Sequence, residues 1–262
     1  MAGSRDARGV TLMSVASPIK RTALGRSFDV YYRDAARTAR MDALNAQFVR
    51  PGDLTFDIGA HIGDRTGSFR RLGASVVVVE PQPRVFRALR LLYRNAPDVH
   101  LHSAAVGAEA GTLDLFVNSD NPTITTASPE LISAAQTSAQ WEGQVWDSKI
   151  TVPVTTLDAL ITQHGIPEFI KIDVEGYEWD ALKGLTTAVP CLSFEFTTIQ
   201  RDVAHRCLCR LAKLGDYAFN MSLGEDHALQ YPNWISGADM ARDLDALPAK
   251  ANSGDIFARL QT

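Results

Sequence analysis

The feature that most constrains this chain is the turn that follows its first predicted strand. The strand at 54–58 leads into Gly59-Ala60-His61-Ile62-Gly63, and the next apolar run ends at Glu80. Glycine lets the backbone approach a ligand closely. An acid at the end of the second strand is well placed to bind the hydroxyls of a ribose. This layout predicts a strand, a tight turn and a helix that hold a nucleoside-containing cofactor.

Asp57 narrows the choice of that cofactor. In the dinucleotide fingerprint G-x-G-x-x-G, a helix N-terminus faces a pyrophosphate. Residues 57–63 do not match this pattern, and Asp57 stands directly before the glycines. A carboxylate repels pyrophosphate but suits the amino group of a methionine moiety. We therefore expect S-adenosylmethionine, and the pattern disfavours an NAD-dependent oxidoreductase.

Strands and helices alternate along most of the chain. Uninterrupted apolar strands such as 76–79 are typical of parallel sheets covered on both faces, and their helical crossovers are right-handed. We expect an α/β fold with a doubly wound, mostly parallel sheet and an antiparallel closing strand. The predicted strands are 54–58, 76–79, 99–102, 112–117, 149–154, 169–172, 191–196, 217–221 and 228–231. The predicted helices are 34–49, 61–72, 84–95, 156–164, 177–185 and 201–214.

The domain organisation follows from two irregular stretches. Residues 1–33 are rich in basic side chains and show little periodicity, so we expect a flexible N-terminal arm. Residues 34–262 then form a single domain, with a polar insertion at 111–155. So long an insertion is either a cover on the substrate side of the site or an ordinary surface excursion.

Composition and simple sequence patterns argue against a nucleic-acid binder, a membrane-spanning protein and a secreted disulfide-rich protein. The 26 basic and 30 acidic residues give a net charge of −4, which disfavours a nucleic-acid partner. No apolar run approaches the roughly 20 residues that span a bilayer, and the first residues do not read as a secretion signal. Cys191, Cys207 and Cys209 are too few and too clustered for a disulfide framework. We expect a cytoplasmic location, and no ligand pattern predicts a metal.

Carboxylates stand at the ends of several predicted strands, where ligands bind in open α/β sheets. Asp173 and Glu175 are two residues apart as one strand ends, so both can project toward one pocket. A carboxylate there can remove a hydroxyl proton, position the sulfonium or the acceptor, or cap the following helix. Glu195 near the next strand end either joins them or only accepts backbone hydrogen bonds. His61 either stacks near the methionine half of the cofactor or caps its helix without a chemical role.

Four runs of the chain form a recognisable set: residues 56–63, Val79-Glu80-Pro81-Gln82-Pro83, Ala105-Val106-Gly107 and residues 170–178 with the sequence IKIDVEGYE. Together they resemble the FkbM family of methyltransferases. The resemblance implies a Rossmann-like class I methyltransferase fold that uses S-adenosylmethionine. It also implies methylation of hydroxyl groups on natural products or sugars. One departure is His61, where the family most often has Asn.

The resulting hypothesis is an O-methyltransferase that acts on a hydroxylated small molecule. The alternatives are an N-methyltransferase and a non-catalytic module that binds S-adenosylmethionine. The expected order of candidates for the general base is Asp173, then Glu175, then Glu195. The predicted cofactor-binding residues are Asp57, Gly59, Ala60, His61, Gly63, Glu80, Pro81, Gln82, Ser103 and Ala104.

Overall fold

The computed structural model describes residues 34–261, and the predicted N-terminal arm lies outside them. Its strands are β1 (Leu54–Ile58), β2 (Ser75–Val79), β3 (Val99–His102), β4 (Ala105–Val106), β5 (Gly111–Val117), β6 (Ser148–Thr155), β7 (Phe169–Ile172), β8 (Cys191–Thr197), β9 (Tyr217–Leu223) and β10 (Ser253–Leu260). Its α-helices are α2 (Ala35–Asn45), α3 (Asp64–Arg71), α4 (Pro83–Leu92), α5 (Pro129–Gln136), α6 (Leu157–His164), α7 (Glu178–Lys183), α8 (Arg201–Leu214) and α9 (Gly237–Ala246). In this part of the chain, no helix has the length and apolar character needed to cross a membrane.

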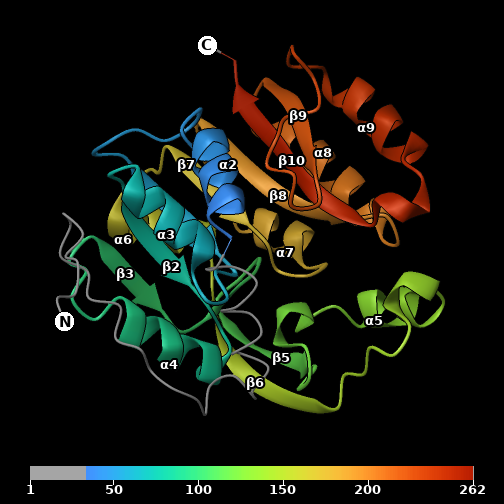
Figure 1. Cartoon of the computed structure of the whole chain (residues 1–262), viewed down its shortest axis with the longest axis horizontal. Helices are drawn as coiled ribbons and strands as arrows, with labels where there is room; N and C mark the ends of the chain where they lie inside the picture. The colour runs from blue at the N-terminus through green and yellow to red at the C-terminus, as the bar shows by residue number, and fades with distance from the viewer. Residues whose placement is uncertain (1–33, 262) are drawn as a thin grey trace, which may run out of the picture.

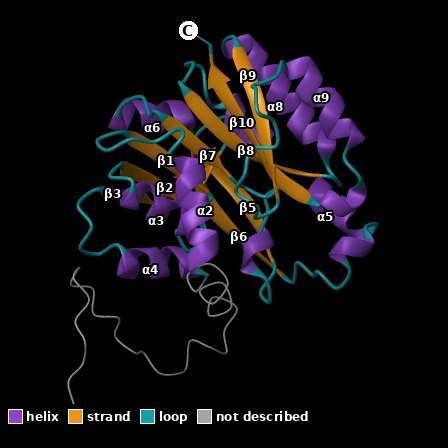
Figure 2. Ribbon diagram, turned by 45° about the horizontal axis from the view of Figure 1, so that its top comes forward, coloured by secondary structure: helices purple, strands orange, loops and turns teal. Residues whose placement is uncertain are grey.

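The main sheet of the described residues has seven strands in the order β3-β2-β1-β7-β8-β10-β9 (Figure 1 and Figure 2). Strands β3, β2, β1, β7 and β8 run parallel to one another, and β10 is antiparallel to both β8 and β9. The predicted doubly wound, mostly parallel sheet with an antiparallel strand near its edge is therefore confirmed. The strand order reverses direction between β1 and β7, which is the position where such sheets bind ligands.

Helices cover both faces of this sheet (Figure 2). The run Ser75–Val79 shows why, because Val77 and Val79 pack in one core cluster while Val76 and Val78 pack in the other. Helices α6, α7, α8 and α9 contribute to the first cluster, and α2, α3 and α4 contribute to the second. A strand with two buried faces has no polar side to alternate, so its sequence is continuously apolar.

Two strands of the insertion, β5 and β6, form a small second sheet with β4 in the order β4-β6-β5. Strands β5 and β6 confirm the two strands predicted there, and between them lie α5 and the short 3-10 turn Pro122–Ile124. Trp141 and Trp146 stack with ring centroids 6.4 Å apart, in a cluster with Leu131. The insertion therefore has its own apolar core.

The C-terminal part corrects the sequence prediction. The predicted strand 228–231 is wrong: this segment is a loop, in which Tyr231 N–H bonds to the side chain of Asn220. The closing strand is β10, which enters the sheet between β8 and β9. Its Asp255 is only 8% exposed, so an acidic side chain occupies a core position of the strand. This acid interrupts the apolar pattern by which a strand is predicted from sequence.

Candidate active site

The glycine turn after β1 packs directly against the end of β7. Gly59 has a φ of 78°, and a Cβ placed on it would lie 1.7 Å from the carbonyl oxygen of Asp173. The amides of Gly59 and Ala60 both donate to the carbonyl of Val79, at 2.9 and 3.1 Å. Asp173 N–H donates to the carbonyl of Ile58 at 2.9 Å. The turn thus joins the carboxyl ends of β1, β2 and β7, and only glycine fits at position 59.

The turn extends further than the sequence predicted. His61 and Gly63 have positive φ values of 48° and 78°, so α3 begins at Asp64 rather than at residue 61. The carbonyl of Gly63 accepts a hydrogen bond of 2.7 Å from the hydroxyl of Tyr93. A non-glycine residue in the left-handed region costs of the order of 1–3 kcal/mol, so the conformation of His61 must be held by its surroundings.

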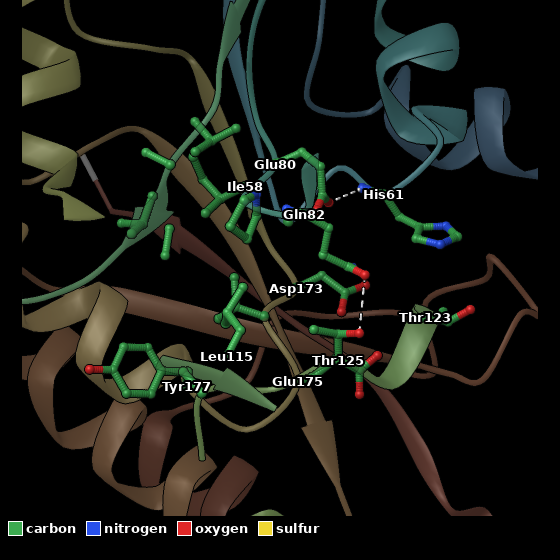
Figure 3. A pocket seen from close by; sticks show the side chains of 18 residues that line it. Ile58, His61, Glu80, Gln82, Leu115, Thr123, Thr125, Asp173, Glu175 and Tyr177 are labelled. Atoms are coloured by element: carbon green, nitrogen blue, oxygen red, sulfur yellow. Dashed lines mark hydrogen bonds between the residues drawn. The ribbon is translucent and has the colours of Figure 1, made fainter. Parts of the chain in front are cut away.

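Glu80 is fixed at the end of β2 by the backbone. One of its carboxylate oxygens accepts a hydrogen bond of 2.9 Å from the amide of His61 (Figure 3), and the other accepts one of 2.7 Å from the amide of Gln82. Burial raises the pKa of Glu80 to about 7, although these two amides oppose the rise. Each oxygen keeps a further lone pair, so the carboxylate can still accept from two adjacent hydroxyl groups.

Glu80 stands in a cavity at the carboxyl ends of β1, β2 and β7. Its apolar part is lined by Ile58, Val79, Ala104, Ala105, Val106 and Leu115. Its polar part is lined by His61, Glu80, Gln82, Thr123, Thr125, Asp173 and Glu175, and Tyr177 also reaches it (Figure 3). This division of the lining into an apolar and a polar part suits a ligand with one flat apolar group and a polar remainder.

The insertion forms one wall of this cavity. Thr125 donates to the side-chain oxygen of Gln82 at 3.1 Å, and the amide nitrogen of Gln82 donates to the carbonyl of Pro122 at 3.1 Å. Thr126 donates to the backbone carbonyl of Glu175 at 2.6 Å. Residues of the insertion are therefore tied both to the end of β2 and to the end of β7.

A second cavity adjoins the first and shares five lining residues with it: Gly59, His61, Thr123, Asp173 and Glu175. The carboxylates around it are Asp57, Asp64, Asp173, Glu175, Glu195 and Glu225, and the cations are Arg65 and Lys171. The excess of acids gives this cavity a negative potential, which attracts cationic groups.

Three of these carboxylates form a tight cluster. Oxygen atoms of Asp173, Glu175 and Glu195 all lie within 4.8 Å of one another. Burial, together with the charge of Asp173, raises the pKa of both glutamates well above the ordinary range. A divalent cation suits such spacing. However, the ammonium of Lys171 lies 3.2 Å from Asp173, so the cluster has a cationic partner of its own and needs no metal to explain it.

Burial shifts the pKa values of Asp57 and His61 in opposite directions, and in both cases it favours the neutral form. Burial raises the pKa of Asp57 to about 6, and the hydroxyl of Thr66 opposes this by donating to it at 2.5 Å. Burial lowers the pKa of His61 to about 4, so its imidazole is neutral near pH 7. A neutral ring can lie beside a positively charged group without repulsion.

Most of the predicted site residues meet at these two cavities. The predicted residues that line at least one cavity are Asp57, Gly59, Ala60, His61, Glu80, Pro81, Gln82, Ala104, Asp173, Glu175 and Glu195. Two do not line either cavity: Gly63 packs against Leu89 and Tyr93, and Ser103 is exposed. The sequence prediction missed Lys171 as a site residue. A lysine inside an otherwise apolar strand was the sequence feature that could have revealed it.

The chemistry of the residues that line the two cavities defines the kind of ligand that fits. The apolar end suits a nucleobase, and the oxygens of Glu80 suit a vicinal diol. The carboxylates of the second cavity suit a cationic centre. A nucleoside that carries a positively charged substituent satisfies all three requirements, and S-adenosylmethionine has that chemistry.

Comparison with known proteins gives the family. Among solved structures, an O-methyltransferase from Bacillus cereus in complex with SAH is 12% identical, with a TM-score of 0.44 over 95% of this chain and 94% of that one. A precorrin-6y C5,15-methyltransferase from Geobacter metallireducens GS-15 is also 12% identical, with a TM-score of 0.44 over 87% of this chain and 86% of that one. No curated protein sequence matches the chain. The family model described as "Methyltransferase FkbM domain" matches residues 57–206, so the chain belongs to the FkbM methyltransferase family and is an S-adenosylmethionine-dependent methyltransferase.

Proposed function

We propose that this protein transfers the methyl group of S-adenosylmethionine to a hydroxyl group of a small-molecule acceptor, a natural product or a sugar. The observation that carries the proposal is the junction of the two cavities, which share Asp173 and Glu175. A cofactor in the first cavity and an acceptor in the second would meet at these two carboxylates. Proton-accepting groups therefore stand where a hydroxyl has to lose its proton.

The residues of the first cavity fit the cofactor. Ala104 would border the adenine, Glu80 would accept hydrogen bonds from the ribose hydroxyls, and Gly59 would lie beneath the methionine portion. Asp57 would contribute negative charge on the methionine side. When bound, the cofactor supplies an electrophilic methyl group on a positively charged sulfur.

The carboxylate cluster supplies the groups that orient the acceptor and take its proton. Asp173 lines both cavities, and we assign it first as the general base, followed by Glu175 and Glu195. Such a base contributes roughly 10²–10⁴-fold to the rate, and the positioning of the two reactants contributes more. The raised pKa of Glu175 and Glu195 makes each of them a stronger base than an exposed glutamate.

The acceptor side supports a small hydroxylated molecule rather than a nucleic acid. The second cavity is lined by six carboxylates and two cations, a charge balance that repels a phosphate backbone. We propose that residues 34–262 act as one catalytic unit, in which Thr123 of the insertion covers the acceptor. An amine acceptor is the second candidate, because carboxylates also orient amines.

Two measurements test this proposal. Isothermal titration with S-adenosylhomocysteine should show binding that Glu80→Ala weakens about 100-fold, because two hydrogen bonds to a charged acceptor are lost. The exposed Glu109→Ala serves as the control and should bind like the unmodified protein. Absence of binding to the unmodified protein would overturn the assignment of the cofactor site.

Transfer of a labelled methyl group to polyhydroxylated metabolites should then be detectable, and Asp173→Asn should lower kcat while cofactor affinity is largely kept. Transfer to amines alone would replace the O-methylation proposal with N-methylation. Full turnover by Asp173→Asn would move the role of the base to Glu175 or Glu195.

A further inference from the structure

A buried ammonium stands beside the carboxylate cluster. Lys171 lies on the central strand β7 and is only 3% exposed. Its Nζ is 2.6 Å from Oδ1 of Asp255 and 3.2 Å from Oδ2 of Asp173. Although burial lowers the pKa of Lys171, the two carboxylates raise it above its ordinary value. Lys171 is therefore a permanent positive charge in the lining of the second cavity.

Asp255 comes from outside the segment that matches the family model. It lies on β10, opposite Glu195 of β8 in the antiparallel register, and is 8% exposed. Its other oxygen, Oδ2, lies 3.8 Å from the guanidinium of Arg65. Asp255 thus faces both cations that line the second cavity, but it does not itself line that cavity.

This placement decides where the positive charge of Lys171 is neutralised. If Asp255 were neutral, Asp173 would be the nearest remaining partner of the ammonium, and its negative charge would be cancelled. Because the carboxylate of Asp255 lies closer to Nζ, at 2.6 Å against 3.2 Å for Asp173, the charge of Asp173 remains available to a cation in the cavities.

We propose that Asp255 is a positioning residue that acts through Lys171: it neutralises this buried ammonium, so that Asp173 keeps a negative charge facing the positively charged sulfur of the cofactor. The inference rests on the proposed function, because it requires the cofactor in the first cavity. Asp255 touches neither the cofactor nor the acceptor in this assignment.

The proposal predicts a preference between two ligands that differ by one charge. S-adenosylmethionine carries a methylated, positively charged sulfur, whereas the sulfur of S-adenosylhomocysteine is neutral. The ratio of their dissociation constants therefore reports the charge of the protein near the sulfur. Loss of packing or stability weakens both ligands alike and leaves this ratio unchanged.

The test measures both dissociation constants at pH 8 by titration calorimetry. Asp255→Asn removes one negative charge and should shift the ratio against S-adenosylmethionine about tenfold, the effect of a unit charge at about 10 Å with an effective dielectric constant of about 20. Lys171→Met should shift the ratio about tenfold in the opposite direction. The double variant Lys171→Met/Asp255→Asn should return to within about twofold of the unmodified protein.

Tyr217→Phe is the control for destabilisation without a change of charge. Tyr217 stands at the start of β9, an edge strand of the sheet, and its hydroxyl bonds to the backbone of Val189. This variant should melt at a lower temperature with the ligand ratio unchanged.

The outcomes separate the inference from the proposed function. If neither ligand binds the unmodified protein, the proposed cofactor site fails. If both bind, the inference is overturned by an Asp255→Asn ratio within about twofold of the original, or by shifts of the same sign in Asp255→Asn and Lys171→Met. If Asp255→Asn does not fold, Lys171→Met alone decides by the sign of its shift.

Discussion

Replacement of Gly59 by alanine tests how the site is held together. Gly59 has a φ of 78°, and an added Cβ would lie 1.7 Å from the carbonyl oxygen of Asp173. An alanine in the left-handed region costs roughly 1–2 kcal/mol. The clash adds about 1–3 kcal/mol, because the neighbour is backbone that cannot rotate away. We therefore expect Gly59→Ala to lower the free energy of unfolding by about 2–5 kcal/mol.

Gly52→Ala is the matched control. Gly52 also has a positive φ, of 92°, but its added Cβ meets nothing within 4 Å. This variant should lose only the conformational part, about 1–2 kcal/mol. Equilibrium unfolding in urea, followed by tryptophan fluorescence, measures both losses. If Gly59→Ala costs no more than Gly52→Ala, the close packing of the β1 turn against the end of β7 is refuted.

Gly59→Ala should also abolish binding of S-adenosylhomocysteine, which Gly52→Ala should keep.

Two further predictions concern buried carboxylates. Burial raises the pKa of Glu178 to about 7, so its stabilising contribution is complete below its unfolded pKa of about 4.5 and is lost as the pH rises through 7. Relative to the unmodified protein, Glu178→Gln should gain about 3 kcal/mol in free energy of unfolding between pH 4 and pH 8, measured by urea titrations at both values. Thr66→Val removes the hydroxyl that donates to buried Asp57 and should cost about 1–3 kcal/mol, whereas Thr66→Ser should retain most of the stability. A carbon-13 titration should show the pKa of Asp57 rising further in Thr66→Val, and an unchanged pKa would contradict the role of the hydroxyl.

Local sequence patterns predicted the site residues that lie at the carboxyl ends of the parallel strands. Continuously apolar strands placed Asp57, Glu80 and Asp173 at one edge, because parallel strands share their carboxyl ends. Helix positions also followed from periodicity, and α8 matches its predicted bounds. The start of α3 did not, because the positive φ of His61 depends on the backbone that surrounds the turn rather than on its own residue type.

Local sequence patterns could not predict which residues pair with the buried charges. Lys171 stands in an apolar strand, and its carboxylate partner Asp255 lies on β10, which pairs with β8 although more than 50 residues separate them in the sequence. Because a charge at a core position breaks the apolar run of β10, the same residue that stabilises Lys171 concealed the strand. Nothing local specifies such a pair, since each member is costly to bury without the other.

The two halves of the site differ in where their residues come from. Every residue that lines the first cavity lies within 58–177, inside the segment that matches the family model. The second cavity also uses Glu225, which is paired at 2.5 Å with Arg37 of α2, and it is backed by Asp255 of β10. These three residues lie outside the matched segment, so substitutions among them change the charge around the second cavity, the proposed acceptor side, while the lining of the first cavity stays intact. The electrostatic field of the second cavity is therefore set in part by chain segments outside the family motifs.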